Sequence, residues 1–444
     1  MFKKTLTELE LCAGKLACTV LRGLSPSNGR RLLDYASCER LFRPDLKETP
    51  IVILSNNDGC CIARSNEAKA LGIAMGEPYF KIKRFCEQNG VLAFSSNYTL
   101  YGNISHRVMC TIEEAWPHVE VYSIDEAFLD LSSLPTHLHD SFCVALQKRI
   151  LKNTGIPTSI GIGPTKTLAK LANHCCKKVF KIPVFNITAV RDSLLAQIVV
   201  GDVWGIGRQW DKKLHARGIR TAADLAQTNA PLLKKQFNVV MMRTAMELQG
   251  IPCGRLQVEE PKQSIMSSKS FGQMQTEYSC VAQSVSSHCA RAVEKMRVQG
   301  LVAQRMYVFV HTNRFREDLA QHFQSIEVNF VNATDDLRLI TKMAKRCLRR
   351  IFKSGFFYKK AGVCLESLIP KDPRQLDLFH QPSDEQLEQT EQLMSVFDKI
   401  NQKYGRSTIR LAAEGYSKPW AMRAEMKSPA YTTRWTDVPK VALH

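Results

Sequence analysis

Short apolar runs that suit buried strands alternate along the first half of the chain with stretches whose apolar residues recur at helical spacing. The runs predict strands over 51–54, 91–95 and 157–163, and a strand, turn and strand over 119–130. The helical stretches are 64–71, 99–115 and 140–153, with a short helix beginning near Asp34. Residues 5–21 could form a helix, although their apolar spacing is loose. The pattern favours a multidomain protein of the α+β class.

The second half, after a linker over 250–262, has a regular order of predicted elements. Strands are expected over 266–271, 303–312, 325–330 and 358–365, and helices over 281–298 and 335–352. This βαββαβ order implies a four-stranded sheet with two helices on one face. The second helix is strongly basic, so the module could lie against a nucleic-acid backbone, or its charge could simply be solvated. A further helix is expected over about 384–403.

The chain carries a large excess of positive charge. Its 444 residues include 61 Lys and Arg against 42 Asp and Glu, a net charge of +19. This excess favours a polyanionic partner, with nucleic acid first and an anionic membrane surface second. No apolar run approaches the roughly 20 residues that span a bilayer, so an integral membrane protein is not expected. The 15 Cys residues form no CxxC pair and have no zinc-finger spacing, and their odd number and scatter favour reduced thiols in the cytoplasm.

Two adjacent acids, Asp125 and Glu126, stand in an apolar run that extends from Val121 to Leu129. Charged groups are rarely left inside a buried strand unless they are paired or bind a cation. Neighbours on a regular strand point to opposite faces, so the two carboxylates can share a site only if the backbone turns there. The alternative is a strand end or tight turn at which both acids are solvated.

A glycine turn at Gly163 precedes a predicted helix on which Lys166, Lys170 and Lys177 share one face. Unpaired N–H groups and the helix dipole at such a start favour an anion, so Lys166 and Lys170 are candidate contacts to DNA. A basic stripe that is only solvated is the alternative.

Residues 199–225 have the pattern of a helix–hairpin–helix around Gly205 and Gly207. Backbone N–H groups in such a turn can contact a DNA phosphate without reading sequence. An ordinary helical hairpin is the alternative. Further on, the polar stretch after Pro370 contains Gln375, Leu376, Asp377, Leu378 and Phe379, whose apolar side chains suggest a docking peptide.

Several blocks, in order from about Asp34 to the C-terminus, resemble the lesion-bypass (Y-family) DNA polymerases, and most closely their bacterial UmuC-like branch. The blocks are Tyr35 to Glu39, Ser55 to Cys60, Ala63 to Lys69, Ser95 to Tyr98, Tyr122 to Phe128, Thr165 to His174 and Gln375 to Phe379. The resemblance implies a right-hand architecture of palm, fingers and helical thumb with a βαββαβ little finger. The implied parts are an atypical segment over 1–33, palm and fingers over 34–195 with the fingers at about 39–95, a thumb over 196–250, a little finger over 262–368 and a C-terminal tail over 369–444.

By matching position, the resemblance implies a site for template-directed nucleotidyl transfer. Asp125 and Glu126 would bind two Mg²⁺ ions, Tyr35 would be the steric gate that excludes a ribose 2′-OH, and Lys69 and Lys177 would hold the incoming triphosphate. The implied activity is error-prone translesion synthesis in SOS mutagenesis. The implied partners are damaged primer-template DNA, a dNTP, the sliding clamp through residues 375–379, a processed UmuD-like subunit and the RecA filament.

The start of the chain departs from this family. The family has a further metal-binding Asp five residues before the gate Tyr, and here that position is Arg30. An Arg there would repel Mg²⁺, and the nearby Asp34 could substitute only by swinging in. We therefore expect a polymerase fold with little or no activity. The first palm strand is missing from its usual place, although residues 1–33 could fill part of the sheet.

Two other classes of function remain open on the sequence. One is a non-catalytic subunit that binds damaged DNA and the clamp, which template binding without nucleotide addition would favour. The other is a metal-dependent repair nuclease, which the acid pair alone would permit. The gate Tyr and the lysine helix speak against the nuclease, and release of labelled nucleotides would support it.

Overall fold

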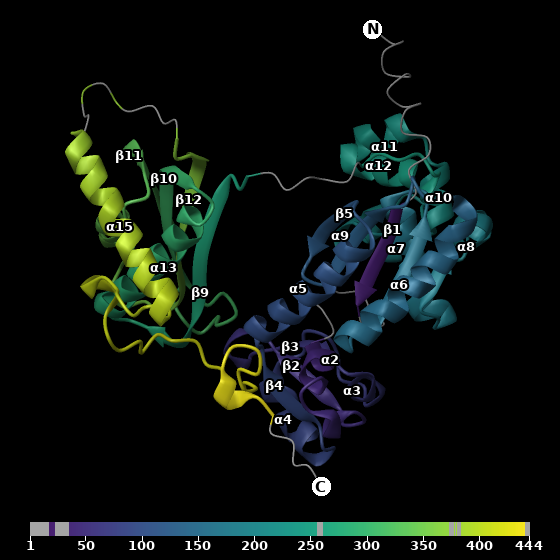
Figure 1. Ribbon diagram of the computed structural model, residues 1–444, viewed down its shortest axis with the longest axis horizontal. Coiled ribbons are helices and arrows are strands. Elements are labelled where there is room, and N and C mark those ends of the chain that lie inside the picture. The colour runs from purple at the N-terminus through teal and green to yellow at the C-terminus, as the bar shows by residue number, and fades with distance from the viewer. Residues whose placement is uncertain are drawn as a thin grey trace. The chain divides into compact units, whose positions relative to one another are not determined.

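The computed structural model describes residues 17–22, 35–254, 261–372, 377, 379 and 383–439. The chain forms two compact units, one of Met1–Glu259 with Glu425–His444 and the other of Glu260–Ala424 (Figure 1). The chain therefore passes into the second unit and returns from it to the first. The sequence had instead predicted a single C-terminal tail from residue 369 onward. In the described part of the chain, no helix is long and apolar enough to cross a membrane.

The first unit contains a five-stranded sheet with the strand order β5-β6-β1-β7-β8. Its strands are β1 (Ala17–Arg22), β5 (Val119–Ser123), β6 (Glu126–Asp130), β7 (Thr158–Gly163) and β8 (Val184–Asn186). The helices α5 (Tyr98–Ala115) and α6 (His139–Thr154) share one core with β6 and β7. The helix α7 (Lys166–Cys175) packs against β7 and β1 and contributes to a second core. The predicted strand, turn and strand over 119–130 is confirmed.

The strand β1 corrects the expectation of a helix over residues 5–21 for residues 17–21, and residues 5–16 lie outside the described part of the chain. It pairs antiparallel with β6 and with β7, and Leu21 lies opposite Glu126. Without β1, the facing edges of β6 and β7 would leave their backbone N–H and C=O groups unpaired, and that cost favours a strand over a loosely patterned helix. The suggestion that residues from 1–33 fill part of the sheet is confirmed for 17–22.

A smaller three-stranded sheet, with the order β3-β2-β4, forms a second part of this unit. Its strands are β2 (Ile51–Leu54), β3 (Cys61–Arg64) and β4 (Leu92–Ser95), and the helices around it are α2 (Tyr35–Arg40), α3 (Asn66–Ala70) and α4 (Tyr79–Gln88). All four residues of β2 are buried, as its continuous apolar run predicts. In the turn after β2, Asn57 and Asp58 have positive φ angles of 61° and 50°, which short polar side chains tolerate best.

A set of short helices follows the five-stranded sheet: α8 (Arg191–Leu195), α9 (Arg208–His215), α10 (Ala222–Gln227), α11 (Ala230–Gln236) and α12 (Val239–Leu248). Three of them begin at side-chain N-caps, namely Thr221, Asn229 and Asn238. Their apolar faces meet Leu168 and Leu171 of α7 in one core, so α7 joins these helices to the sheet.

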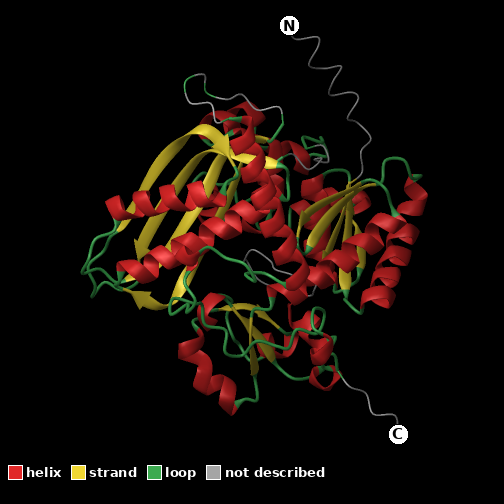
Figure 2. Cartoon of the chain, turned by 60° about the vertical axis from the view of Figure 1, so that its left-hand side comes forward, coloured by secondary structure: helices red, strands yellow, loops and turns green. Residues whose placement is uncertain are grey.

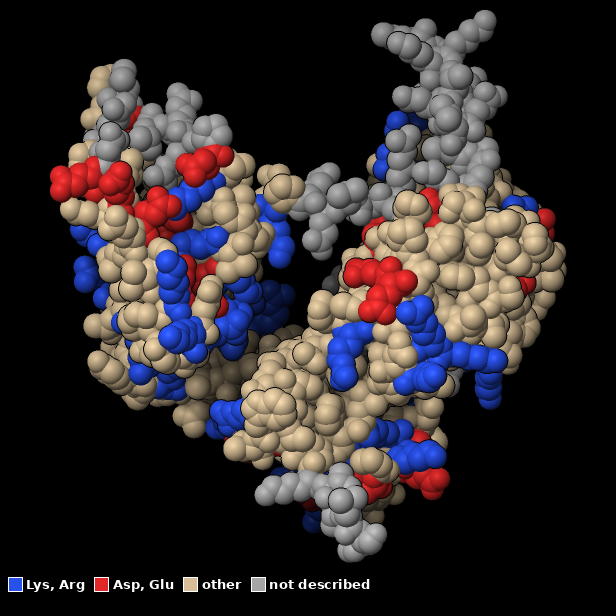
Figure 3. Space-filling view, in the orientation of Figure 1, with Lys and Arg blue, Asp and Glu red and all other residues tan. Residues whose placement is uncertain are grey.

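The second unit is a four-stranded antiparallel sheet with the order β11-β10-β12-β9. Its strands are β9 (Ser264–Gln275), β10 (Leu301–Thr312), β11 (Phe323–Thr334) and β12 (Tyr358–Pro370), and its helices are α13 (Tyr278–Arg297), α14 (Leu337–Ile351) and α15 (Asp384–Tyr404). The predicted βαββαβ order is confirmed, and Figure 2 shows helices over one face of the curved sheet. Figure 3 shows Lys and Arg side chains over much of the visible face of this unit.

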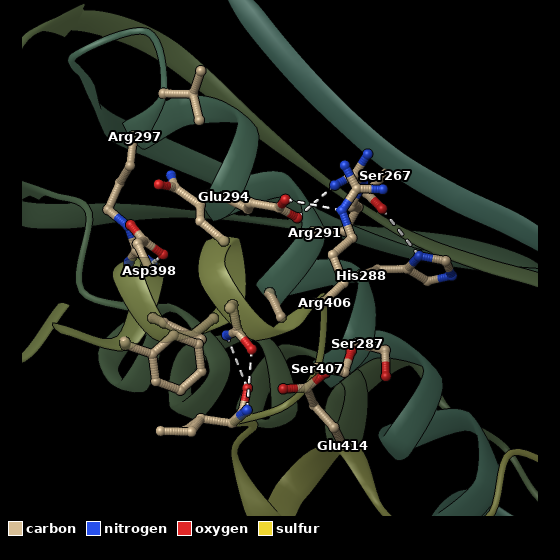
Figure 4. A pocket seen from close by; sticks show the side chains of 18 of the residues that line it. Ser267, Ser287, His288, Arg291, Glu294, Arg297, Asp398, Arg406, Ser407 and Glu414 are labelled. Carbon is tan, nitrogen blue, oxygen red and sulfur yellow. Dashed lines mark hydrogen bonds and ion pairs between the residues drawn. The ribbon is translucent and has the colours of Figure 1, made fainter. Parts of the chain in front are cut away.

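The helix α15 and the region after it are folded onto α13 of the same unit. Arg297 donates to both oxygens of Asp398, at 2.7 and 2.5 Å. Glu294 accepts from Arg291 at 2.5 Å and from Arg406 at 3.1 Å. A cavity of about 620 Å³ lies among these ion pairs (Figure 4). The chain up to residue 424 is thus anchored to the second unit.

Candidate active site

The two adjacent acids lie at a hairpin turn. β5 ends at Ser123, which pairs with Glu126 at the start of β6, so Ile124 and Asp125 form the turn. Ser105 of α5 donates a hydrogen bond to the Ile124 carbonyl oxygen at 2.5 Å, and Ser123 Oγ donates to Asp125 Oδ1 at 2.5 Å. The turn supplies the condition under which both carboxylates can share one site.

The Asp125 carboxyl is buried, with 3% of the residue exposed. Burial raises its pKa to about 6, and the neighbouring Glu126 adds to the rise. The hydrogen bond from Ser123 and the positive charges of Lys170 and Lys177 act in the opposite direction. A buried carboxyl with a raised pKa in a cluster of charges is typical of a functional site.

Lys170 on α7 is the observed partner of Glu126. Its Nζ lies 2.6 Å from Glu126 Oε2, and both side chains are nearly buried. The ammonium also lies over the rings of Tyr122 and Trp204, 5.3 and 5.5 Å from their centroids. Aromatic faces and a carboxylate together compensate for the loss of water around this charge.

Lys166 repeats this arrangement one turn earlier on α7. Its Nζ lies 2.6 Å from Glu120 Oε2 and 5.1 Å from the centre of the Phe128 ring. The sequence pattern predicts Lys166 and Lys170 as contacts to DNA on a basic stripe. In the structure both ammonium groups lie against carboxylates of β5 and β6, which would compete with a DNA phosphate for their charge, and contact with DNA stays a prediction.

The helix start after Gly163 does bind an anion, and that anion belongs to the protein. Glu247 of α12 accepts from the Thr167 backbone N–H at 3.0 Å and from Thr167 Oγ1 at 2.5 Å. Its other oxygen accepts from the backbone N–H groups of Cys253 and Gly254, at 3.4 and 3.1 Å. A carboxylate at a helix N-terminus is favoured by the dipole and by the unpaired N–H groups there.

Tyr35 lies at the start of α2 and is 1% exposed. Its ring stacks on Tyr101 with centroids 4.1 Å apart and planes 10° apart, and it meets the edge of Tyr98 at 6.3 Å. Burial raises the pKa of the Tyr35 phenol, and the negative charge of Asp125 contributes to the rise. The phenol therefore stays protonated near the acid pair.

The two predicted phosphate lysines have different surroundings. Lys177 lies in a wide helical turn, Cys176–Phe180, and is 8% exposed. Its charge acts on Asp125, so it belongs to the same cluster as the acids. Lys69 lies in the last turn of α3, where its ammonium donates to Asn66 Oδ1 at 3.0 Å.

The donor set for a metal is carboxylate-poor. Asp125 and Glu126 are hard oxygen ligands of the kind that Mg²⁺ prefers. Within the described ranges, no group of three His, Cys, Asp or Glu side chains could hold a metal ion. β1 contains no acid, and its register with β6 ends at the Leu21–Glu126 pair. Arg30 and Asp34, which the sequence singled out, lie outside the described residues.

The predicted DNA hairpin is an open turn. Gly205 has a φ of +88°, a conformation that favours glycine, and Gly207 is the N-cap of α9. A Cβ at either position would meet nothing within 4 Å, so the backbone there is accessible to a ligand. In the predicted clamp peptide, Gln375, Leu376 and Leu378 lie outside the described residues. Phe379 is described and is 85% exposed.

The chain matches known proteins over most of its length. Residues 34–174 match the impB/mucB/samB family, residues 262–378 match the C-terminal domain of that family, and residues 391–441 match a domain of unknown function, DUF4113. The chain is 46% identical to Protein UmuC of Salmonella typhimurium over 415 residues, which is 92% of this chain and 97% of that protein. This chain belongs to the impB/mucB/samB family. It is also 42% identical to Protein SamB of Salmonella typhimurium, over 92% of this chain and 97% of that protein.

More distant relatives and solved structures agree with this family. DNA polymerase IV of Oceanobacillus iheyensis is 29% identical over 84% of this chain and 88% of that protein. A Y-family DNA polymerase chimera of Dbh and Dpo4 superposes with a TM-score of 0.63 at 18% identity, over 80% of this chain and 99% of that one. An insertion ternary complex of Dbh DNA polymerase gives 0.53 at 19% identity, over the same shares. The predicted Y-family fold is confirmed. As labels that follow the predicted domains, whose bounds stay a prediction, we call the five-stranded sheet the palm, the three-stranded sheet the fingers, helices α8–α12 the thumb and the second unit the little finger.

Sequence reasoning missed three buried acids of the first unit, Glu39, Glu120 and Glu247, which are 1%, 8% and 6% exposed. The available signal was an acid inside an otherwise apolar element, as in Glu39 at the end of Tyr35-Ala36-Ser37-Cys38. Their partners lie far away in the chain, so the signal marks an acid that needs a partner without naming it.

Proposed function

We propose that this chain is a UmuC-type translesion DNA polymerase whose nucleotidyl transfer is impaired. The observation that carries the proposal is the buried hairpin of Asp125 and Glu126, close to Tyr35 and Lys177 and beside a β1 strand without an acid. The two acids, with Tyr35 and Lys177 near them, are the arrangement expected of a polymerase palm. The absence of an acid from β1 leaves the metal site one carboxylate short.

The residues of the site have distinct roles in this proposal. Asp125 and Glu126 would hold Mg²⁺, which lowers the pKa of a primer 3′-OH and offsets charge on the leaving pyrophosphate when it is bound. Tyr35, held face to face against Tyr101, presents a rigid ring beside the acids and would exclude a ribose 2′-OH. Lys177 would neutralise triphosphate oxygens close to Asp125. Lys69 of the fingers would reach the same phosphates.

Impairment follows from charge. Lys170 Nζ lies 2.6 Å from Glu126 Oε2, so a cation that binds Glu126 must compete with this ammonium group. In the family, an acid on the first palm strand would help that competition. Here β1 contains no acid. Divalent cations should therefore bind weakly, and extension should be slow.

The test is primer extension on an abasic template with Mg²⁺, with a sliding clamp and a processed UmuD-like subunit supplied. Asp125→Ala is the matched control, since it removes one carboxylate. We expect extension far below that of a UmuC with its first acid, and we expect Asp125→Ala to abolish what remains. Robust extension would refute the impairment, and extension that survives Asp125→Ala would refute the site.

A second candidate function is a non-catalytic subunit that binds damaged DNA and the clamp. The observations that favour it are the exposed Phe379 of the clamp peptide and the basic helix α14, whose exposed side includes Lys342, Arg349 and Arg350. Binding of primer-template with no nucleotide addition at any Mg²⁺ concentration would select this function. Loss of clamp binding in Phe379→Ala would locate the docking peptide. The processed UmuD-like subunit and the RecA filament remain proposed partners in either case.

A further inference from the structure

The region that matches the domain of unknown function is divided between the two units. Its first part, from residue 391 within α15 up to residue 424, belongs to the little-finger unit. Its last part, from Glu425, belongs to the palm and fingers unit. Residues 425–431, which we call the return segment, lie beside β4 (Figure 1). The contacts of this segment connect it to Tyr35, the proposed steric gate.

The return segment extends the edge of the fingers sheet. Lys427 forms a parallel bridge with Ser95, the last residue of the edge strand β4. Ser95 N–H donates to the Met426 carbonyl at 3.0 Å, and Met426 N–H donates to Ser95 Oγ at 3.0 Å. Asp58 accepts from the Glu425 N–H at 3.0 Å and from Ser95 Oγ at 2.6 Å. An edge strand is thereby paired instead of being left open.

Ser428 links the return segment to Glu39, the buried acid of α2. Its Oγ donates to Glu39 Oε1 at 3.1 Å and accepts from Asn97 Nδ2 at 3.0 Å. Asn97 is also the N-cap of α5, where its Oδ1 accepts from Leu100 N–H. Ser428 and Asn97 are 7% and 2% exposed, so these polar groups depend on one another for hydrogen bonds.

Glu39 connects Ser428 to the gate. It lies one helical turn after Tyr35 on α2. Its Oε1 also accepts from Tyr101 Oη at 2.7 Å, and Tyr101 is the ring on which Tyr35 stacks. Burial raises the pKa of the Glu39 carboxyl, and the hydrogen bonds from Tyr101 and Ser428 oppose the rise. Both donors therefore stabilise the charged form of this acid.

A ring contact anchors the far end of the segment. Tyr431 stacks on Phe42, just beyond α2, with centroids 4.7 Å apart and planes 6° apart. The α2 region is thus bound to the return segment at Glu39 and at Phe42. Such a pair of contacts restricts both the tilt and the position of a short helix.

We propose that the return segment is a positioning element of the nucleotide site, in which Ser428 and Tyr431 hold α2 so that Tyr35 stays stacked on Tyr101. A gate discriminates against a 2′-OH only while its ring is rigid, because a ring that can withdraw admits the extra oxygen. The selectivity part of this inference rests on the proposed function. The mechanical link from Ser428 to α2 does not.

The experiment compares Ser428→Ala, Tyr431→Ala and Ser428→Thr in the full chain, with Thr433→Ala as the matched control. Thr433 is exposed on the same part of the chain. The first measurement is hydrogen–deuterium exchange of the α2 amides. Ser428→Ala should speed it by about tenfold, as the loss of a hydrogen bond to a charged group predicts. Ser428→Thr should restore the protection, because it keeps the hydroxyl.

The second measurement is equilibrium binding of dATP and ATP opposite a template thymine, with a dideoxy-terminated primer so that no extension is needed. The preference for dATP should fall by about three- to tenfold in Ser428→Ala and Tyr431→Ala, and return in Ser428→Thr. Thr433→Ala should change neither measurement. A merely structural role would weaken both nucleotides equally.

The outcomes separate the two proposals. Unchanged exchange of α2 in both alanine variants overturns the positioning role. Faster exchange with an unchanged preference overturns the link to the gate. If the parent chain binds neither nucleotide, the proposed polymerase function fails, and exchange of α2 alone then decides whether the return segment holds this helix.

Discussion

Glu247 offers a sharp test of how the palm is joined to the thumb. Its carboxylate lies at the start of α7 and accepts four hydrogen bonds, two from Thr167 and one each from the N–H groups of Cys253 and Gly254. The perturbation is Glu247→Gln, which keeps the shape and removes the charge. Its amide group can turn only one oxygen toward these donors, so the other donors face an NH₂ group.

The expected cost follows from these contacts. A hydrogen bond to a charged group contributes about 1.5–3 kcal/mol, and a buried donor left without an acceptor costs about 1–3 kcal/mol. The lost interaction with the dipole of α7 adds about 0.3–1 kcal/mol. Since glutamine retains part of the network, we expect a loss of about 3 kcal/mol in the free energy of unfolding. For a unit of this size that corresponds to a fall of roughly 6–12 °C in Tm.

The assay is differential scanning calorimetry of the full chain, with hydrogen–deuterium exchange to show that the change lies in α7 and α12. Glu113→Gln is the control, because Glu113 is exposed on α5 of the same unit. It should shift Tm by less than about 1 °C, as expected for a surface substitution. A Glu247→Gln protein with the same Tm as the control would refute the view that this carboxylate holds α7 and α12 together.

Three further predictions concern single charges. Lys170→Met leaves Glu126 buried without its ammonium and should cost about 3–5 kcal/mol in urea unfolding, whereas a loss below about 1 kcal/mol would contradict the ion pair. Arg22→Asp puts an acid at the end of β1, one residue beyond the Leu21–Glu126 pair, and should increase Mg²⁺-dependent extension; an unchanged rate would show that the missing acid is not what limits the site. Burial and nearby lysines lower the pKa of His288 to about 4 from 6.5, so the unfolded chain binds more protons in this interval. The free energy of unfolding of the little finger should therefore fall by up to about 3 kcal/mol as the pH falls from 6.5 to about 4. His288→Asn should flatten that pH dependence.

The sequence by itself determined the elements whose signal is local. The apolar run of Ile51–Leu54 made β2, the βαββαβ order of the second unit followed from its periodicity, and the acid pair at a turn predicted the β5–β6 hairpin. The blocks from Tyr35 onward were sufficient for the family. Local patterns suffice in these cases because periodicity and turn chemistry act over a few residues.

Only the tertiary structure decided which charges meet. Lys166 pairs with Glu120, which is 46 residues away in the sequence. Thr167 bonds to Glu247 across 80 residues, and Ser428 bonds to Glu39 across 389 residues. The strand β1 likewise takes its place because two neighbouring strands present unpaired backbone groups, a requirement that the local pattern of residues 17–22 does not show. A buried charge or an open strand edge requires a partner, but the sequence does not say where along the chain that partner lies. Packing of the whole unit makes that choice.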